Sequence, residues 1–246
     1  MNKVFGLIGK NIRYSYSPLL FKQIFKKHGW SARYDLFDLN DIAEVENLMQ
    51  NEYLAGFNVT IPYKKVIMEW LDDISLEAKH VNAVNTVKKE NNRWIGYNTD
   101  IYGFEKSLND FINQHIQKAV ILGNGATART IKYVLQQNGI RFITLSRTKT
   151  ENTWLYKEFS SEALQEIPLI INTTPLGNKN HPTLKPPLPY EGIGPRHYLF
   201  DLNYNPPITP FLMEGLKRGA QVKNGMAMLI YQAEKTFEIW RSPTPG

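Results

Sequence analysis

The stretch that decides the fold is Ala119-Val120-Ile121-Leu122-Gly123-Asn124-Gly125-Ala126-Thr127-Ala128. Its apolar start predicts a short buried strand, and the helix-period segment after the glycines ends at Gly139. In a Gly-x-Gly-x-x-Ala pattern, the first glycine permits a tight turn and the second lets a pyrophosphate approach the backbone, while the small last residue allows close helix–strand packing. The stretch therefore predicts a Rossmann-type dinucleotide site; the alternative is a glycine-rich turn that only packs. The residues predicted to bind the dinucleotide are Gly123, Asn124, Gly125, Ala126, Thr127 and Ala128.

The residues after the next predicted strand, Phe142–Leu145, indicate which dinucleotide binds. An NAD site usually has an Asp or Glu about 20 residues after the first glycine, where it binds the ribose 2′-hydroxyl. Here the strand runs into Ser146-Arg147-Thr148, and the next acid is Glu151. Hydroxyl and guanidinium groups can bind a 2′-phosphate instead. The sequence therefore predicts NADP(H), bound through Ser146, Arg147 and Thr148; the alternative is that Arg147 is a solvated surface residue.

Composition and charge exclude several classes of protein. The 246 residues include no cysteine, which excludes a disulfide scaffold, a thiolate nucleophile and Cys-ligated metals. The five histidines are scattered without a zinc-binding pattern, so we expect no metal site. The formal net charge is +6, but the basic residues form only scattered pairs, so we expect no nucleic-acid partner. No apolar run approaches the ~18 residues of a membrane span, and we expect a cytoplasmic protein without a membrane partner.

Short apolar runs alternate with helix-period segments along the chain, which is the pattern of βαβ units and predicts an α/β fold. A break near residue 100 divides the pattern into two α/β units. In the first unit, a hairpin is predicted to turn at Asn91-Asn92, because asparagine tolerates left-handed backbone. The last predicted helix, Met226–Trp240, carries an apolar stripe on one face. Further strands are predicted at Val4–Ile8, Tyr34–Leu39, Gly56–Thr60, Leu169–Asn172 and Tyr198–Leu202.

Polar side chains at the ends of predicted strands mark a candidate ligand site in the first unit, because open α/β sheets bind ligands there. Ser15 and Ser17 precede a predicted helix, and two hydroxyls at that place suit a carboxylate. Ser17 is followed by Pro18 and is equally suited to be a helix N-cap. Lys64 falls in the first turn of a helix predicted over Pro62–Trp70. A cation there opposes the helix dipole, which disfavours a purely structural lysine.

Two further polar residues join this set. Asn85 interrupts an apolar strand, where a polar side chain needs hydrogen-bond partners. Asp100 stands at the start of a predicted helix, where the alternative role is that of a cap.

Nine segments of the chain, from about Gly9 to Trp240, resemble shikimate dehydrogenases and occur in the order of that family. They are Ser15–Pro18, Gly56–Lys64, Ala83–Thr86, Gly96–Asp100, the loop at Gly123, Ser146–Thr148, Ile171–Pro175, Asp201–Pro206 and Asn224–Ala233. The departures are modest. Phe21 replaces a frequent histidine, Ser146 replaces the usual asparagine, and Asn124 and Thr127 vary the phosphate loop.

The resemblance implies both architecture and activity. It implies an N-terminal α/β substrate-binding domain over residues 1–100, a Rossmann-type NADP-binding domain over residues 101–224, and a C-terminal helix over residues 225–246 that returns to the substrate domain. The implied enzyme catalyses the reversible NADP(H)-linked conversion of 3-dehydroshikimate to shikimate, in chorismate and aromatic amino-acid biosynthesis. It would act as a monomer or homodimer.

The motif matches also assign roles to single residues. Lys64 and Asp100 form the implied catalytic pair. The resemblance assigns Ser15, Ser17, Thr60, Asn85, Tyr204 and Gln232 to the substrate. It adds Thr173, Leu202 and Gly225 to the cofactor-binding residues already named. The residues agree with this chemistry, because alcohol oxidation needs a group that takes the hydroxyl proton, and Lys64 is the best-placed candidate.

Two alternatives remain open at the level of sequence. A quinate/shikimate dehydrogenase with relaxed substrate and cofactor choice would keep most of these motifs. A catalytically silent nucleotide-binding sensor could keep the glycine loop, but the presence of Lys64, Asp100 and both serines argues against it.

Overall fold

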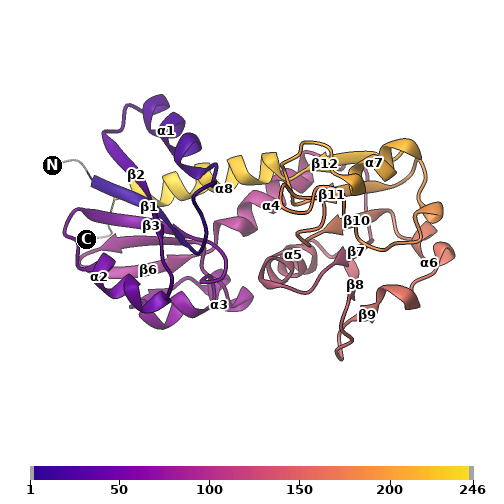
Figure 1. The fold of residues 1–246 in the computed structure, drawn as a ribbon, viewed down its shortest axis with the longest axis horizontal. Coiled ribbons are helices and arrows are strands. Elements are labelled where there is room, and N and C mark those ends of the chain that lie inside the picture. Colours follow the sequence, from indigo (N-terminus) through magenta and orange to yellow (C-terminus); the bar gives the residue numbers. More distant parts are fainter. Residues whose placement is uncertain (1–2, 244–246) are drawn as a thin grey trace. The chain divides into compact units, whose positions relative to one another are not determined.

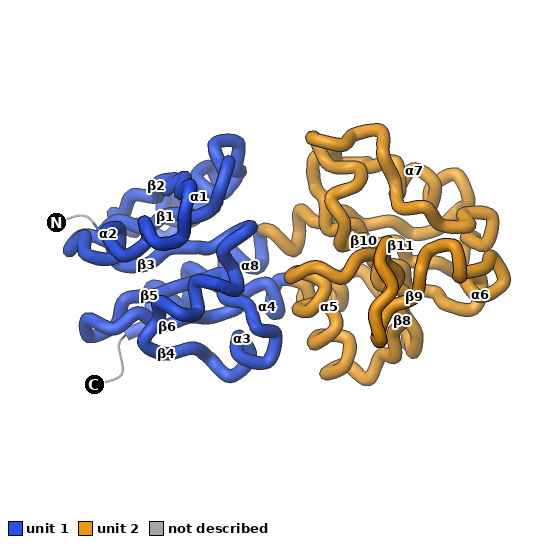
Figure 2. Tube along the Cα trace, turned by 60° about the horizontal axis from the view of Figure 1, so that its bottom comes forward, with its two compact units in different colours: residues 1–103, 230–246 blue, residues 104–229 orange. Residues whose placement is uncertain are grey.

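The chain folds into two compact units, each built on its own β-sheet (Figures 1 and 2). The structure is a computed structural model that describes residues 3–243. Unit 1 comprises residues 1–103 and 230–246, and unit 2 comprises residues 104–229. The ranges 1–100 and 225–246 predicted above include residues 1–2 and 244–246, which lie outside the described residues. Helices α4 (Thr99–Asn109) and α8 (Met226–Arg241) each begin in one unit and continue into the other.

Unit 1 contains a six-stranded mixed sheet with the strand order β2-β1-β3-β5-β6-β4. Its strands are β1 (Lys3–Gly9), β2 (Ala32–Asp38), β3 (Leu54–Val59), β4 (Asp73–Ile74), β5 (Thr86–Glu90) and β6 (Arg93–Tyr97). Its helices are α1 (Ser17–Lys27), α2 (Val45–Met49) and α3 (Leu76–Val81), with 3₁₀ helices at Ile42–Glu44 and Val66–Trp70. β1 pairs in parallel with β2 and β3, whereas β5 is antiparallel to both β3 and β6.

The predicted hairpin is confirmed. β5 and β6 pair from Thr86↔Tyr97 to Glu90↔Arg93, and the two residues between them are Asn91 and Asn92. Both have positive φ, 48° and 60°. A two-residue hairpin needs left-handed backbone at both central positions to match the twist of the strands, and asparagine adopts it more readily than most residues.

Unit 2 is a Rossmann-type fold. Its strands are β7 (Lys118–Leu122), β8 (Arg141–Ser146), β9 (Trp154–Leu155), β10 (Leu169–Asn172), β11 (Tyr198–Asp201) and β12 (Gln221–Asn224). All neighbours are parallel, in the order β9-β8-β7-β10-β11-β12, which is the 3-2-1-4-5-6 order of dinucleotide-binding folds. Its helices are α5 (Ala126–Gln137), α6 (Ser161–Gln165) and α7 (Pro210–Lys217), with 3₁₀ helices at Tyr156–Glu158 and Tyr190–Gly192. β10 and β11 are buried along their whole length, as expected for a parallel sheet covered on both faces.

The last helix, α8, packs on the sheet of unit 1 through aromatic side chains. The Trp240 ring stacks on Phe5 with 4.4 Å between centroids, and its indole N–H donates to the Val87 carbonyl at 3.0 Å. Phe237 packs edge-on against Trp30. The predicted apolar stripe is fully buried only in this later part, at Ala233, Phe237 and Trp240. These contacts hold the later part of α8 over the strands of unit 1.

The prediction of a helix over Pro62–Trp70 is wrong in its first half. Residues 61–65 form turns, and only Val66–Trp70 is helical, as a 3₁₀ helix. The reason is that tertiary contacts use this backbone. The Tyr63 N–H donates to the Thr60 carbonyl, and the Lys64 carbonyl accepts from the Val84 N–H at 2.7 Å. The helix-dipole argument for Lys64 therefore does not apply.

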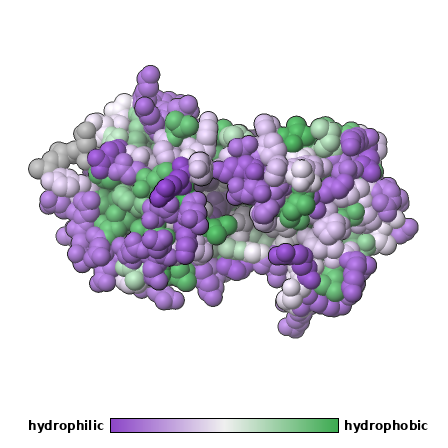
Figure 3. All heavy atoms as spheres, in the orientation of Figure 1, coloured by the Kyte–Doolittle hydropathy of each residue, from purple (hydrophilic) through white to green (hydrophobic). Residues whose placement is uncertain are grey.

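Hydrophilic residues cover much of the face shown in Figure 3, with scattered hydrophobic ones. Among the helices of residues 3–243, none is long and apolar enough to cross a membrane.

Candidate active site

The topology of unit 1 brings four chain segments to the edge of the sheet at which β1 and β3 end. The loops that follow β1 and β3 leave at the same edge, because these strands are parallel neighbours. β5 runs antiparallel to β3, so the residue just before it, Asn85, lies beside the end of β3, and the Val59 N–H donates to its carbonyl. β6 ends next to the start of β5 and leads directly into α4.

The central feature of this edge is an ion pair between Lys64 and Asp100. The Lys64 Nζ lies 2.6 Å from Asp100 Oδ2, and the two side chains are only 16% and 11% exposed. Lys64 stands in the turn after β3, and Asp100 stands in the first turn of α4. A paired ammonium and carboxylate with so little exposure are screened much less than a surface pair.

Asn85 fixes the carboxylate of that pair. Its Oδ1 accepts from the Thr99 N–H at 2.7 Å, which sets the orientation of the amide. Its Nδ2 therefore points at Asp100 Oδ1 and donates to it at 2.8 Å. Asp100 thus accepts a hydrogen bond on each oxygen, one from the amide and one from Lys64.

The two serines have different roles in the local structure from those the sequence predicts. Ser17 is not the N-cap of α1: the helix begins at Ser17, and its N-cap is Tyr16, whose side chain makes no capping bond. Instead, Ser15 Oγ accepts from the Ser17 N–H at 3.2 Å, so Ser15 makes the local contact. The Ser17 hydroxyl hydrogen-bonds the Tyr34 phenol, whose pKa is raised by burial. The alternative role of Ser17 as a helix N-cap is therefore wrong.

Thr60 and Gln232 also belong to unit 1, whereas Tyr204 belongs to unit 2. Thr60 is half-buried directly after β3, and its N–H donates to the Ile8 carbonyl. Gln232 lies on α8, with Oε1 3.5 Å from the Thr99 hydroxyl. Tyr204 lies in the loop after β11, where burial raises the pKa of its phenol.

The glycine loop of unit 2 fits a dinucleotide. Gly123 has φ +100°, and a Cβ there would lie 2.8 Å from Thr173 Oγ1, so only glycine suits the turn. Gly125 is the N-cap of α5 without any side-chain capping bond, and a Cβ at this position would meet nothing within 4 Å. Uncapped N–H groups that face open space are what a pyrophosphate needs. Ala126, Thr127 and Ala128 form the first turn of the helix.

Asn124 in this loop has a partner that the sequence did not indicate. Its Oδ1 accepts from the Lys132 ammonium at 2.7 Å. Burial lowers the pKa of Lys132, and the neighbouring Arg129 lowers it further. Asn124, a departure from the family pattern, is thus held by a lysine two turns along α5.

Three further predicted cofactor residues, Thr173, Leu202 and Gly225, directly follow the carboxyl ends of β10, β11 and β12. The Thr173 hydroxyl donates to the Leu122 carbonyl at 2.7 Å, which ties the loop after β10 to the end of β7. A Cβ on Gly225 would lie 2.1 Å from the Leu202 carbonyl oxygen, so these two residues pack backbone against backbone.

At the end of β8, Ser146 and Arg147 differ in what they can offer a ligand. The Ser146 hydroxyl hydrogen-bonds the Thr148 carbonyl and accepts from the Thr148 N–H, so it shapes the turn. Arg147 is exposed, and its charge acts on the buried Tyr156, opposing the effect of burial that raises the pKa of that phenol to about 12. The guanidinium is therefore the group here that is available to an anion.

Sequence reasoning did not assign a role to a cluster of buried polar side chains inside unit 1. Asn58, Thr86 and Thr236 are at most 6% exposed and hydrogen-bond one another. Asn58 also accepts from the Tyr34 hydroxyl at 2.9 Å. A threonine inside the apolar face of the last helix was the available signal.

Asp201, at the end of β11, is a second missed residue. It is completely buried and accepts from the Thr209 hydroxyl, the Asn172 amide and the Asn203 N–H. Burial raises the pKa of this carboxyl to about 6, against the effect of these donors. Asp201 thereby fastens three loop segments at the carboxyl edge of the Rossmann sheet.

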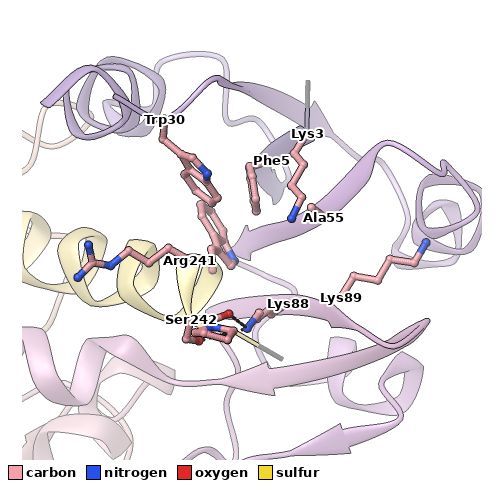
Figure 4. A pocket seen from close by; sticks show the side chains of 10 residues that line it. Lys3, Phe5, Trp30, Ala55, Lys88, Lys89, Arg241 and Ser242 are labelled. Atoms are coloured by element: carbon pink, nitrogen blue, oxygen red, sulfur yellow. Dashed lines mark hydrogen bonds between the residues drawn. The ribbon is translucent and has the colours of Figure 1, made fainter. Parts of the chain in front are cut away.

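A pocket of unit 1, of about 280 Å³, lies near Lys3 at the opposite end of β1 from the candidate site (Figure 4). Three of its basic side chains, Lys88, Lys89 and Arg241, already have partners. Lys88 donates to Ser242 and pairs with Glu90, and Arg241 lies over the Phe237 ring. Residues 3–243 contain no group of three or more His, Cys, Asp or Glu that could hold a metal ion.

Known proteins are similar to this chain over its whole length. The family described as the shikimate dehydrogenase substrate binding domain matches residues 7–87. The NADP(+) shikimate dehydrogenase of Pelagibacter ubique is 38% identical over 257 residues, covering 100% of this chain and 96% of the relative. The chain belongs to the shikimate dehydrogenase family. A second member, from Methanococcus maripaludis, is 36% identical over 261 residues, covering 99% of this chain and 93% of the relative.

The likeness to the family extends to three dimensions. The shikimate 5-dehydrogenase of Thermus thermophilus, solved in complex with NADP(H) and shikimate, has a TM-score of 0.88 at 28% identity. The match covers 99% of this chain and 95% of that structure, so both units share the family's architecture of an N-terminal substrate domain and a Rossmann domain.

Proposed function

We propose that this protein is an NADP-dependent shikimate dehydrogenase that converts 3-dehydroshikimate and shikimate into each other. The observation that carries the proposal is the shielded Lys64–Asp100 pair, held by Asn85 at the sheet edge where the shared motifs meet. The solved relative from Thermus thermophilus, with shikimate and NADP(H) bound, supports the same ligands here.

In this proposal, unit 1 binds the substrate. Ser15 and Ser17 hold its carboxylate, and their hydroxyls suit an anion because each can donate a hydrogen bond. The motif match also assigns Tyr204 to the carboxylate. The substrate hydroxyls are bound by Thr60, Asn85, Asp100 and Gln232.

Lys64 moves the proton. NADP⁺, when bound, supplies the hydride acceptor for oxidation of the C3 hydroxyl. Lys64 Nζ, as a neutral amine, takes the proton of that hydroxyl; in the reduction, its ammonium donates a proton to the carbonyl oxygen. Asp100 keeps Nζ oriented and stabilises the ammonium form through the 2.6 Å contact.

Unit 2 binds the cofactor in this proposal. The N–H groups at the start of α5 and the glycine loop bind the pyrophosphate, and Arg147 pairs with the 2′-phosphate. Ser146 and Thr148 shape the loop around that phosphate, and Thr173, Leu202 and Gly225 form the surface at the strand ends that the rest of the cofactor contacts. We further propose that the protein is cytoplasmic, acts as a monomer or homodimer, and binds neither nucleic acid nor membranes. Light scattering of the purified protein tests the oligomeric state.

The test is NADPH oxidation on addition of 3-dehydroshikimate, with shikimate identified as the product. Turnover with NADPH and 3-dehydroshikimate is expected, with much slower turnover of quinate and slower use of NAD. Equal turnover of quinate with NAD would favour the quinate/shikimate alternative. NADPH binding without any turnover would favour a nucleotide sensor and overturn the proposal.

A further inference from the structure

Thr236 is a fully buried polar residue on α8, one helical turn after Gln232. Its hydroxyl contacts Thr86 Oγ1 at 2.9 Å, Thr99 Oγ1 at 3.0 Å and Asn58 Nδ2 at 3.3 Å. A threonine inside a helix commonly bonds back to the carbonyl of its preceding turn. Here the hydroxyl instead contacts side chains from β3, β5 and the start of α4.

The three threonine hydroxyls form a closed triad, since Thr86 and Thr99 also lie 3.1 Å apart. A hydroxyl donates one hydrogen bond and accepts two, so each member can bond both others, and Thr86 and Thr99 bond Asn85 as well. A β-branched side chain has few rotamers in a helix, so the position of the Thr236 hydroxyl follows the rotation of α8. The triad therefore sets the rotation of α8 near Gln232, whereas Trp240 and Phe237 hold the end of the helix.

The rotation of α8 determines where Gln232 points. The Gln232 amide oxygen lies 3.5 Å from Thr99 Oγ1, a member of the triad. The same Thr99 orients Asn85 through its backbone N–H. Thr99 thus contacts both Gln232 and Asn85, the residue that holds Asp100 of the catalytic pair.

We propose that Thr236 is a positioning residue that presents Gln232 to the substrate by locking the rotation of α8. The proposal rests on the proposed function, in which Gln232 binds a substrate hydroxyl. Thr236 itself does not touch the substrate in this account.

The experiment compares T236V, T236S, Q232A and the double variant Q232A/T236V. T236V keeps the shape of threonine and removes the hydroxyl, and we expect it to raise KM for shikimate about tenfold, the equivalent of one hydrogen bond, with kcat changed less than KM. T236S restores the hydroxyl and should restore KM. The double variant should have the KM of Q232A alone, because Thr236 acts through Gln232. If Thr236 only stabilises the fold, T236V leaves KM unchanged. If Thr236 affects KM independently of Gln232, the effects of the two substitutions on KM add in the double variant.

T144V is the matched control. Thr144 is also a buried threonine, on β8 of unit 2, and its hydroxyl has no hydrogen-bond partner within residues 3–243. The same chemical change there should leave KM for shikimate unaltered. If T236V does not fold, T236A takes its place, because the space it leaves can admit a water that satisfies the remaining hydroxyls.

A crystal structure of T236V, or of T236A in its place, decides the proposal independently of turnover. Gln232 should move away from Thr99 in the variant and remain in place in T236S. An unmoved Gln232, or additive effects on KM in the double variant, would overturn the proposal. Absence of shikimate turnover in the unaltered protein would refute the proposed function alone, since the crystallographic comparison still decides the role of Thr236.

Discussion

Unit 1 and unit 2 place their hydrogen-bonded clusters of buried polar side chains differently. In unit 1, Asn58, Thr86 and Thr236 lie inside the fold and hydrogen-bond one another. In unit 2, the central strands are apolar, and the buried polar cluster around Asp201 lies where the strands end. The difference follows from what each unit must hold in place. In the proposed function, unit 1 orients side chains that act on a substrate, whereas unit 2 offers backbone N–H groups at strand and helix ends to a cofactor.

The largest effect is expected at the reacting group of unit 1. K64A should lower kcat about 10²- to 10⁴-fold, the usual contribution of general acid–base catalysis, and change KM for shikimate far less. Steady-state kinetics measures both. K65A, which removes the exposed neighbouring lysine, should stay within about twofold of the unaltered protein. Near-normal turnover in K64A would remove Lys64 from the mechanism.

Asp201 tests the polar cluster of unit 2 through its pH dependence. Its pKa is about 6 in the folded protein and 3.8 in an unfolded chain, so the folded state binds the proton more tightly. The free energy of unfolding should therefore fall as pH rises from about 4 to about 6, by an order of 2–3 kcal/mol, and then level off. Denaturant unfolding of D201N should lose this part of the slope. An identical slope in D201N would show that other groups cause it.

Arg147 tests the assignment of the cofactor to unit 2. R147A should weaken NADP binding about ten- to a hundredfold, because a hydrogen bond to a charged group is lost, while NAD binding barely changes. Fluorescence titration with both cofactors measures the two affinities. R141A, at the other end of the same strand, should alter neither. Equal weakening of both cofactors in R147A would mean that Arg147 supports the loop and does not bind the phosphate.

The two serines should give the smallest effects. S15A and S17A should each raise KM for shikimate severalfold. Each should also lower the free energy of unfolding by about 1 kcal/mol, since Ser15 accepts from the Ser17 N–H and Ser17 bonds Tyr34. Kinetics and thermal unfolding separate the two effects. If both variants lose stability with unchanged KM, the pair is structural only.

The elements that local chemistry determines could be predicted from the sequence. The Asn91–Asn92 turn, the glycine loop at Gly123 and the buried parallel strands each depend on short-range backbone preferences or on a simple apolar pattern. The start of the last helix, Met226, is predicted for the same reason.

The errors and omissions arise where distant residues decide the conformation. The turns at residues 61–65 depend on a hydrogen bond from the Val84 N–H. The partner of Ser17 is Tyr34, which lies on β2. Thr236 meets Thr86 across 150 positions of sequence. No local pattern carries such pairings, although a lone threonine on an apolar helix face indicates that one exists.

The most direct test of the central claim is to titrate shikimate and NADP⁺ separately into the unaltered protein, S15A and R147A. If unit 1 binds the substrate and unit 2 binds the cofactor through its phosphate, S15A weakens only shikimate binding and R147A weakens only NADP⁺ binding. A loss of affinity for both ligands in either folded variant would contradict this division of the molecule.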